Sequence, residues 1–287
     1  MVPKKAILPA ASLALTLSGC EGVLDPRGPV GAAEKLILID SLAIMLAIVV
    51  PVIVATVAFA WWFRASNTRA TYRPNWAFSG SLELIVWAIP ALVITFLGGI
   101  AWFGSQALDP YRPIDSKIKP IEVEAVSLDW KWLFIYPDEG IATVNRLVVA
   151  AGTPVHFKIT SASVWNAFFV PQLGSMIYSM AGMTTQLNLQ ADKPGTFPGL
   201  SSQFSGDKFS DMHFEVRAVT ADAYQQWVAA AKESGSALDR EAYARLAQSA
   251  DSAPVMSYKS IDPTLFGAIV AGTAPEPAGA PEITNSP

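Results

Sequence analysis

The sequence predicts a membrane protein in which a hairpin of two transmembrane helices precedes an all-β Greek-key domain and a short helical C-terminal extension. Three patterns indicate this fold class. Two long apolar runs occupy the first third of the chain, apolar and polar residues alternate through its middle, and helical spacing of apolar residues returns after residue 220. Side chains repeat every two residues along a strand and about every 3.6 along a helix, so the patterns distinguish the two.

The composition agrees with a membrane protein. Of the 287 residues, 52% are hydrophobic and only 15% are charged, against roughly 25% charged residues in soluble globular proteins. The formal net charge of −4 offers no basic surface for phosphates, so we do not expect nucleic acid as a partner. The single cysteine, Cys20, excludes an internal disulfide framework and a thiolate cluster built by this chain alone.

Residues 1–19 have the pattern of an export signal. Lys4 and Lys5 form a positive region, residues 6–17 form a short apolar core, and Leu-Ser-Gly-Cys ends at Cys20. This ending resembles the bacterial lipoprotein box, in which cleavage leaves a lipid-bearing cysteine at the new N-terminus. We therefore expect a lipoprotein signal peptide, with Cys20 as the lipid (palmitate) attachment site. An ordinary signal peptide with an incidental cysteine is the alternative.

The two apolar runs, residues 36–63 and 82–103, are each long enough to cross a bilayer, which takes about 20 residues. Pro51 in the first run removes one backbone hydrogen bond, a defect that membrane helices tolerate. Trp61 and Trp62 near its end are typical of the membrane interface. Buried core helices are the alternative, and the scarcity of charge in both runs argues against it.

The loop between the two runs, residues 64–81, predicts the orientation. It contains Arg64, Arg69 and Arg73 and no acidic residue, and loops rich in arginine and lysine stay in the cytoplasm. Residues 20–35 and everything after the second helix are then periplasmic. This agrees with an exported N-terminus, so two independent patterns predict the same topology.

The residues after the second helix predict a β-domain with a helical end. Short alternating strands separated by Gly and Pro turns are typical of a Greek-key sandwich or barrel, which we assign to residues 120–219. Helices are expected over 221–233 and 239–248 within a C-terminal extension, residues 220–270. The Ala/Pro/Gly/Glu-rich residues 271–287 are expected to be disordered. Strands are expected near residues 121–127, 130–136, 146–149, 155–160, 185–190 and 213–219.

Two segments of the β-domain resemble the copper-binding motifs of subunit II of the haem–copper oxidases. In the cytochrome c oxidases of that family, a cupredoxin domain holds two coppers with a segment His-x-Phe-x-x-Pro and a loop Cys-x-Glu-x-Cys-x-x-x-His-x-x-Met. Residues 166–171 here read Asn-Ala-Phe-Phe-Val-Pro, and residues 201–212 keep the length of the loop and its final methionine. The resemblance therefore implies a cupredoxin-like fold for residues 120–219.

The residues that should bind copper are replaced in this chain. Serines stand in place of both cysteines, and a serine hydroxyl stays protonated near neutral pH and is a poor copper ligand. The resemblance thus implies a loop that keeps its shape and holds no metal. These vestigial copper positions are Asn166 and Phe209 (histidines in the family), Ser201 and Ser205 (cysteines), Gln203 (glutamate) and the unchanged Met212.

Loss of this copper centre together with a lipoprotein box resembles the ubiquinol oxidases of the cytochrome bo type, over almost the whole chain from Cys20 to Phe266. The resemblance implies that ubiquinol is oxidised in a haem-bearing catalytic subunit I, which holds the haems and the remaining copper. This chain would then need no cofactor and contain no catalytic residue. It would be a multi-pass subunit of the bacterial inner membrane, in contact with membrane lipid and further oxidase subunits, in a complex that reduces oxygen and pumps protons.

Glu83 begins the second apolar run and lies seven residues before Pro90. The same spacing occurs in subunit II of the family, where the glutamate lies at the mouth of a proton-uptake channel of the catalytic subunit. The resemblance implies this role for Glu83, since ionisable residues in membrane segments are often part of proton relays. An interfacial carboxylate that reaches to water is the alternative.

Four other residues are predicted to be structural. Trp130 and Trp132 match the aromatic strand that receives the electron from cytochrome c in copper-bearing relatives. Without copper, we expect both to serve packing. His156 and His213 match no ligand of the family and are too few to rebuild the site, so we expect ordinary strand histidines.

Two other functions stay open from the sequence alone. A cytochrome c oxidase subunit that has lost its copper would need another electron entrance, and the sequence has no haem-attachment motif Cys-x-x-Cys-His. A free-standing membrane lipoprotein with a cupredoxin-like binding module would not co-purify with a haem-bearing subunit.

Overall fold

The computed structural model describes residues 22–71, 73–248 and 253–275 of the chain. They form two compact units, with residues 33–109 in one and the remaining described residues in the other. Cys20 and the tail residues 276–287 lie outside the described part. What we predict for the signal peptide and for that part of the tail therefore stays a prediction.

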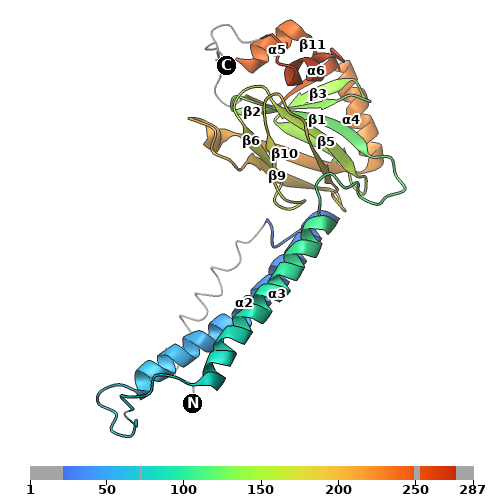
Figure 1. Ribbon diagram of the computed structural model, residues 1–287. Coiled ribbons are helices and arrows are strands. Elements are labelled where there is room, and N and C mark those ends of the chain that lie inside the picture. Colours follow the sequence, from blue (N-terminus) through green and yellow to red (C-terminus); the bar gives the residue numbers. More distant parts are fainter. Residues whose placement is uncertain (1–21, 72, 249–252, 276–287) are drawn as a thin grey trace, which may run out of the picture. The chain divides into compact units, whose positions relative to one another are not determined.

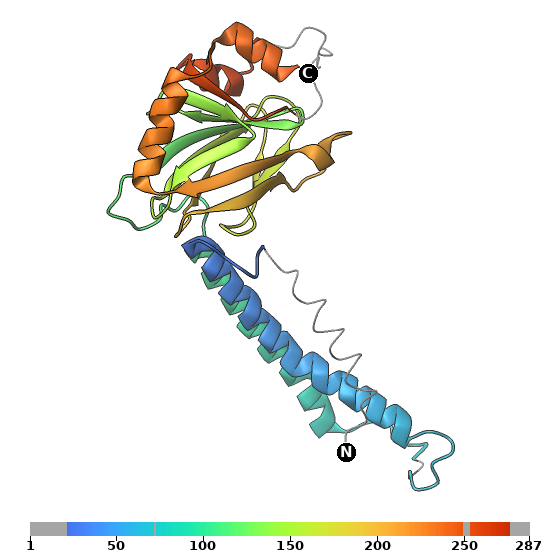
Figure 2. The ribbon, with the colours of Figure 1, turned by 180° about the vertical axis from the view of Figure 1, so that it is seen from behind.

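One unit is a hairpin of two long helices, α2 (Pro29–Trp62) and α3 (Gly80–Ala107), which lie side by side in both ribbon views (Figures 1 and 2). Their close approach is clearest at Gly104, where a Cβ atom would lie 2.7 Å from Cδ1 of Ile37. Glycine leaves room for the isoleucine, so the two backbones can come close near the end of α3.

Both helices extend beyond the predicted spans 36–63 and 82–103. α2 begins at Pro29, although charged residues follow within its first turns, and α3 continues to Ala107. Apolar composition marks what can lie in the hydrocarbon of a bilayer, whereas backbone hydrogen bonds decide where a helix begins and ends. Proline suits the first turn of a helix, because its missing N–H is not needed there.

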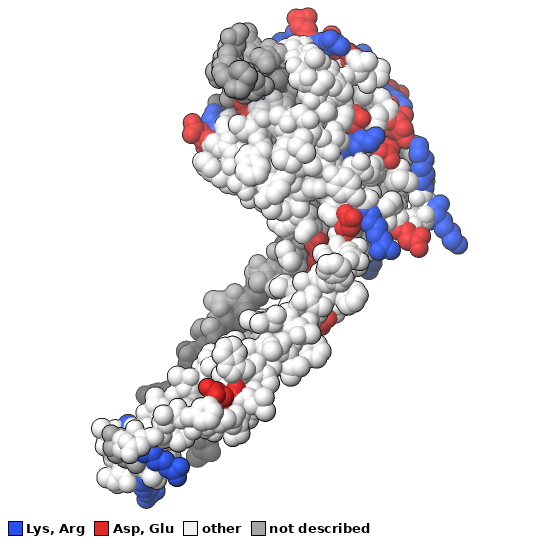
Figure 3. Space-filling view, in the orientation of Figure 1, with Lys and Arg blue, Asp and Glu red and all other residues white. Residues whose placement is uncertain are grey.

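The helix surfaces fit a membrane environment. Each helix contains an 18-residue apolar window of which none is buried within the chain, and both are long enough to cross a membrane. Figure 3 shows that the hairpin has few charged side chains along its length and that basic side chains gather at its loop end; the loop contains three arginines. An exposed apolar helix is unlike the buried core helix of a soluble protein, which was the alternative.

The residues before α2 lie against the β-domain. The backbone N–H of Arg27 donates to the carbonyl of Gln172 at 2.7 Å, and that of Asp192 donates to the carbonyl of Arg27 at 2.8 Å. A Cβ atom on Gly28 would lie 2.0 Å from the carbonyl oxygen of Gln190, so only glycine fits. The residues just before and at the start of α2 are thus part of the same compact unit as the β-domain.

The other unit is a β-sandwich of a seven-stranded and a five-stranded sheet (Figure 1). The larger sheet has the order β11-β12-β3-β2-β1-β5-β8 and the smaller one β4-β10-β9-β6-β7. The pairs β1/β5, β4/β10 and β11/β12 are parallel, and the other neighbours are antiparallel. The predicted all-β domain is confirmed, and of the two predicted forms, sandwich or barrel, it is a sandwich. Its strands are β1 (Ile121–Leu128), β2 (Lys131–Tyr136), β3 (Ile141–Val144), β4 (Arg146–Ala150), β5 (Val155–Ser161), β6 (Asn166–Phe169), β7 (Ile177–Ser179), β8 (Thr185–Leu189), β9 (Gly195–Ser201), β10 (His213–Val219), β11 (Ser236–Leu238) and β12 (Met256–Ile261).

Strand β2 has an uninterrupted apolar sequence because both of its faces are covered. All of its residues are buried. Trp132, Phe134 and Tyr136 belong to the core between the two sheets, whereas Leu133 and Ile135 belong to a second core on the outer face of the larger sheet. A strand that is buried on both faces needs no polar alternation.

The residues of the C-terminal extension after 235 contribute to this second core, whereas residues 221–233 pack against the core between the sheets. Helix α4 (Ala221–Glu233) runs along one edge of the sandwich (Figure 2), and α5 (Arg240–Ala247) and α6 (Leu265–Val270) follow. The predicted helices are thus present, but β11 and β12 also join the larger sheet beside β3. The predicted division between residues 120–219 and 220–270 therefore does not separate two structural units. These strands were missed because β11 is only three residues long and β12 has one buried residue, Tyr258, among six.

The described residues 271–275 correct the prediction that disorder begins at residue 271. The N–H of Thr273 donates to the carbonyl of Ala268 at 2.8 Å, and Gly272 has a φ of +66°. A left-handed glycine followed by such a bond is a common way to end a helix, here α6. The Ala/Pro/Gly/Glu composition suggested disorder, but its first glycine, Gly272, ends a helix.

Candidate functional site

The two segments that resemble copper motifs meet in the smaller sheet. Strands β6 and β9 are antiparallel neighbours, and Phe168 is paired with Ser201 across them. The Ser201 hydroxyl donates to the side-chain carbonyl of Asn166 at 2.9 Å, and both side chains are buried. Residues that occupy a cysteine and a histidine position of the family thus satisfy each other, as buried polar groups generally must.

The loop between β9 and β10 returns to this buried pair. The N–H of Ser201 donates to the carbonyl of Met212 at 3.1 Å, and the N–H of Ser202 donates to the carbonyl of Ala167 at 3.1 Å. The Met212 side chain is buried in the core. Three of the six vestigial positions, Asn166, Ser201 and Met212, are therefore brought together by the fold.

The other three positions form the outer part of the loop. Phe209 belongs to the short 3-10 helix η1 (Phe209–Asp211) and packs edge-on against Phe204, with ring centroids 5.7 Å apart. The Ser205 hydroxyl is buried and has no hydrogen-bond partner among the described residues, and Gln203 is half-buried. This part of the loop is therefore stabilised by aromatic packing, and the Ser205 hydroxyl takes no part in hydrogen bonds within the described residues.

Trp130 lies over the loop, a contact that the sequence did not predict. A Cβ atom on Gly206 would lie 2.5 Å from Cη2 of the Trp130 ring, and Gly206 has a φ of +132°. Trp130 itself has a φ of +66° in the turn between β1 and β2, which is rare for a bulky residue. The glycine inside the loop motif was the one available signal, because it leaves room for a large neighbour.

The side chains at this site do not fit a dinuclear copper centre. Those that converge offer a hydroxyl, an amide and a thioether, whereas copper of this kind needs thiolate and imidazole ligands. The Ser201 hydroxyl is already used by Asn166. Throughout the described residues, no group of three His, Cys, Asp or Glu side chains is placed to hold a metal ion. These side chains can maintain the shape of the loop, and we derive no electron-transfer step through them.

Both histidines lie in strands outside this cluster. Nδ1 of His156 in β5 lies 3.0 Å from Oδ1 of Asn188 in the neighbouring strand β8. His213 is exposed at the start of β10. Trp132 lies in the core with its ring edge-on to Phe168 at a centroid distance of 5.3 Å. These residues have the structural places that the sequence predicted for them.

Glu83 belongs to the helix hairpin, in the first turn of α3. Its N–H donates to the carbonyl of Ser79 at 3.0 Å, and its side chain is exposed. The first turn of a helix carries a partial positive charge that favours a carboxylate. The position is consistent with either a proton entrance or an interfacial anchor, so its role stays a prediction.

Comparisons with known proteins agree with this description. Residues 138–219 match the family "Cytochrome C oxidase subunit II, periplasmic domain", and residues 232–272 match the "COX Aromatic Rich Motif". The chain is 49% identical over 258 residues to the cytochrome bo(3) ubiquinol oxidase subunit 2 of Pseudomonas aeruginosa, covering 90% of this chain and 78% of the relative. It is 47% identical over 274 residues to the ubiquinol oxidase subunit 2 of Acetobacter aceti, covering 94% and 89%. Among solved structures, the periplasmic domain of subunit II of cytochrome oxidase (CoxB) of Bradyrhizobium japonicum is 25% identical with a TM-score of 0.40, covering 42% of this chain and 98% of that domain.

The β-sandwich with its modified loop, following two apolar helices, defines a periplasmic-domain subunit II of the haem–copper oxidase class. Within that class, the chain shares 41–49% sequence identity with ubiquinol oxidase subunits over most of its length, which identifies the family. The chain belongs to the family of ubiquinol oxidase subunit 2, as a membrane subunit of an oxidoreductase complex.

Proposed function

We propose that this chain is the non-redox subunit II of a proton-pumping oxidase that transfers electrons from ubiquinol to oxygen in the aerobic respiratory chain. The observation that supports this most directly is the buried Ser201–Asn166 pair, which occupies the centre of the former copper loop. A periplasmic copper relay is needed to receive electrons from cytochrome c. A quinol that is oxidised within the membrane needs none.

In this proposal, the haems and the remaining copper belong to the catalytic subunit I, and this chain supplies a docking surface for assembly and a proton entrance at Glu83. Affinity purification of the chain from bacterial membranes tests the assembly. We expect a haem-bearing subunit and further oxidase subunits to co-purify in fixed ratio. Recovery of the chain alone, under conditions that keep other respiratory complexes intact, would support a free-standing lipoprotein.

Copper titration tests the loss of the metal centre. Adding copper to the purified chain should produce no intense visible bands from thiolate-to-copper charge transfer, because the β-domain has no cysteine to provide a thiolate. Appearance of such bands with a fixed copper stoichiometry would show that the loop alignment is wrong. The same result would favour a subunit that accepts electrons from cytochrome c.

We also propose a position in the bacterial inner membrane with the N-terminus held by lipid at Cys20. The Leu-Ser-Gly-Cys ending supports this, and residues 22–32 lie against the β-domain on the expected periplasmic side. Mass spectrometry of the mature subunit should show residues 1–19 missing and a diacyl or triacyl mass on Cys20. An intact Met1 would contradict the assignment. The Cys20→Ser variant should stay in the membrane, because two spanning helices anchor it far more firmly than a lipid chain.

A further inference from the structure

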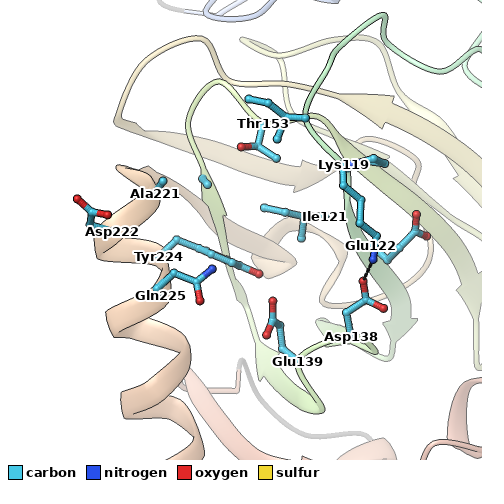
Figure 4. A pocket seen from close by; sticks show the side chains of 13 residues that line it. Lys119, Ile121, Glu122, Asp138, Glu139, Thr153, Ala221, Asp222, Tyr224 and Gln225 are labelled. Carbon is cyan, nitrogen blue, oxygen red and sulfur yellow. Dashed lines mark hydrogen bonds and ion pairs between the residues drawn. The ribbon is translucent and has the colours of Figure 1, made fainter.

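A surface cavity of about 370 Å³ lies where several parts of the β-domain meet. Its walls come from the linker before β1, the start of β1, the turn between β2 and β3, and the first turn of α4 (Figure 4). The vestigial copper loop does not line it. The cavity is therefore a feature of its own, separate from the site described above.

The walls of this cavity carry an excess of negative charge. They contain four carboxylates, Glu122, Asp138, Glu139 and Asp222, and one cation, Lys119. The ammonium of Lys119 pairs with Asp138 at 2.7 Å, an ion pair drawn in Figure 4. The other three carboxylates have no ion-pair partner among the described residues. Figure 4 shows Glu139 next to the end of the Tyr224 side chain, whereas Asp222 points away from it on the outer side of α4. Glu139 is thus the unpaired carboxylate best placed to meet a cation.

A buried hydroxyl without a partner also faces this cavity. Tyr224 is only 3% exposed, and its hydroxyl has no hydrogen-bond partner within the described chain. Figure 4 shows its side chain reaching from α4 into the cavity towards Glu139. Burial, assisted by the charges of Glu139 and Asp138, raises the pKa of the phenol well above its ordinary value, so the hydroxyl keeps its proton. A protonated hydroxyl can donate one hydrogen bond and accept others.

The neighbouring Tyr136 shows that the fold can satisfy such a group. Its hydroxyl donates to the carbonyl of Val148 at 3.0 Å and accepts from the N–H of the same residue at 2.8 Å. Buried hydroxyls are normally paired in this way, and an unpaired one needs an explanation. At Tyr224 the explanation available in the structure is the acidic cavity that the side chain enters.

We propose that this cavity binds an alkylammonium group. An ammonium has three donors and no acceptor, which suits carboxylate oxygens together with the lone pairs of a phenol. In the proposed complex, the ammonium donates to Glu139 and to the oxygen of Tyr224, while the Tyr224 O–H donates to a carboxylate. Charge-assisted hydrogen bonds of this kind are about twice as strong as neutral ones.

Other positively charged ligands fit less well. Ca²⁺ and Mg²⁺ need about six or more oxygen ligands in a tight shell, and the described residues contain no group of three ligating side chains close enough to hold a metal. A lipid ethanolamine headgroup would bring a phosphate against the same three unpaired carboxylates. The ammonium can therefore come from a free polyamine or from a lysine side chain of a neighbouring oxidase subunit.

Equilibrium binding of spermidine to the purified, detergent-solubilised oxidase tests the free-amine source. We expect saturable binding that becomes at least about tenfold weaker in Glu139→Gln and several-fold weaker in Tyr224→Phe. A tenfold loss corresponds to about 1.4 kcal/mol. The matched control is Glu233→Gln, which removes the same charge from the exposed end of α4 and should leave binding unchanged.

Zero-length carbodiimide crosslinking of the same complex, without added amine, tests the lysine source. A crosslink from Glu139 to a lysine of another subunit, absent in Glu139→Gln, would identify the occupant as part of the assembly. The proposal is overturned if spermidine does not bind and no such crosslink forms. It is also overturned if Glu233→Gln weakens spermidine binding as much as Glu139→Gln does.

Discussion

Ser201 and Asn166 show how two residues can replace metal ligands without leaving a defect. A serine alone at a buried position would carry an unpaired hydroxyl, which costs about 1–3 kcal/mol. Here the hydroxyl donates to the amide oxygen of Asn166 at 2.9 Å, and the amide nitrogen lies 3.3 Å from the carbonyl of Val164. This pair of side chains is therefore satisfied by hydrogen bonds within the chain, whereas the buried Ser205 hydroxyl has no partner among the described residues.

The sequence could predict the identity of these positions but not their bonds. The spacing of the loop motif pointed to Ser201, Ser205 and Phe209 by position alone. The pairing of Ser201 with Asn166 depends on the register of two strands that are distant in sequence, and the orphaned Ser205 hydroxyl depends on burial. Both features depend on tertiary packing, so no pattern in the neighbouring sequence indicates them.

Two buried tyrosines should respond differently to loss of the hydroxyl. Tyr136→Phe leaves the N–H and the carbonyl of Val148 without their partner, which should cost about 1–3 kcal/mol. For a domain of this size, we expect the thermal midpoint to fall by roughly 2–10 °C. Tyr224→Phe removes a hydroxyl that has no partner within the described chain, so the midpoint should hardly change in amine-free buffer. Thermal unfolding of the purified oxidase, followed by tryptophan fluorescence, measures both. Equal effects would contradict this assignment of hydrogen bonds.

Glu83 should matter only if it changes its protonation state. Glu83→Gln keeps the size and the hydrogen-bonding capacity of the side chain but cannot release a proton. We expect normal assembly and haem content with about a tenfold fall in turnover, equivalent to roughly 1.4 kcal/mol on the limiting barrier. Glu83→Asp should be milder, because a titrating carboxyl remains. Oxygen consumption at saturating quinol measures this, and wild-type turnover in the glutamine variant would reduce Glu83 to an interfacial anchor.

At the level of elements, the two sheets show which strands a sequence can reveal. Strands β5, β8 and β10 have bounds close to those expected, because they are long enough to show apolar alternation. Strands β3, β7 and β11 are only three or four residues long, which is too short for a periodic pattern to be recognised. The predicted strand at 130–136 begins one residue later, because Trp130 belongs to the turn.

Strand β12 should stabilise the domain through the side of the strand that carries the buried Tyr258. Tyr258 is buried in the same outer core as Leu133, whereas Lys259, the next residue, is exposed. Tyr258→Ala should cost about 3 kcal/mol or more through the lost burial and the cavity that remains. The matched control Lys259→Ala should change stability by less than about 0.5 kcal/mol. Thermal unfolding of the two variants decides this. A small effect of Tyr258→Ala would mean that the extension does not contribute to the fold.

The loop between β9 and β10 should still be able to hold copper if its shape has been kept. Restoring the family ligands should give a dinuclear centre with thiolate-to-copper charge-transfer bands on copper addition. A variant that folds normally but binds no copper would mean that the shape of the loop has also diverged. The five changes are Asn166→His, Ser201→Cys, Gln203→Glu, Ser205→Cys and Phe209→His.

At the level of the whole molecule, the sequence was most informative where its patterns were long. Two apolar helices, a β-domain and helical segments near the end were all predictable, because each extends over many residues. The sequence did not predict that the C-terminal extension completes the β-domain, nor that the segment before α2 lies against it. Both depend on contacts between parts of the chain that are far apart in sequence.

In the proposed complex, electrons enter within the membrane and not through the β-domain. Quinol oxidation requires a membrane-embedded site in the catalytic subunit, while oxidation of cytochrome c would require a metal relay at the loop of residues 201–212. That loop and its neighbour Asn166 offer a hydroxyl hydrogen-bonded to an amide, a thioether and aromatic rings. These groups do not form a metal relay. The choice of electron donor therefore separates the two possibilities.

The most direct test is oxygen consumption by the purified complex with two alternative donors. We expect rapid oxygen uptake with reduced ubiquinol and none above background with reduced cytochrome c at the same enzyme concentration. The haem spectrum, recorded on the same sample, controls for intact enzyme. Sustained turnover with cytochrome c as the sole donor would contradict the account, because it would require an electron entrance that this chain is proposed to have lost.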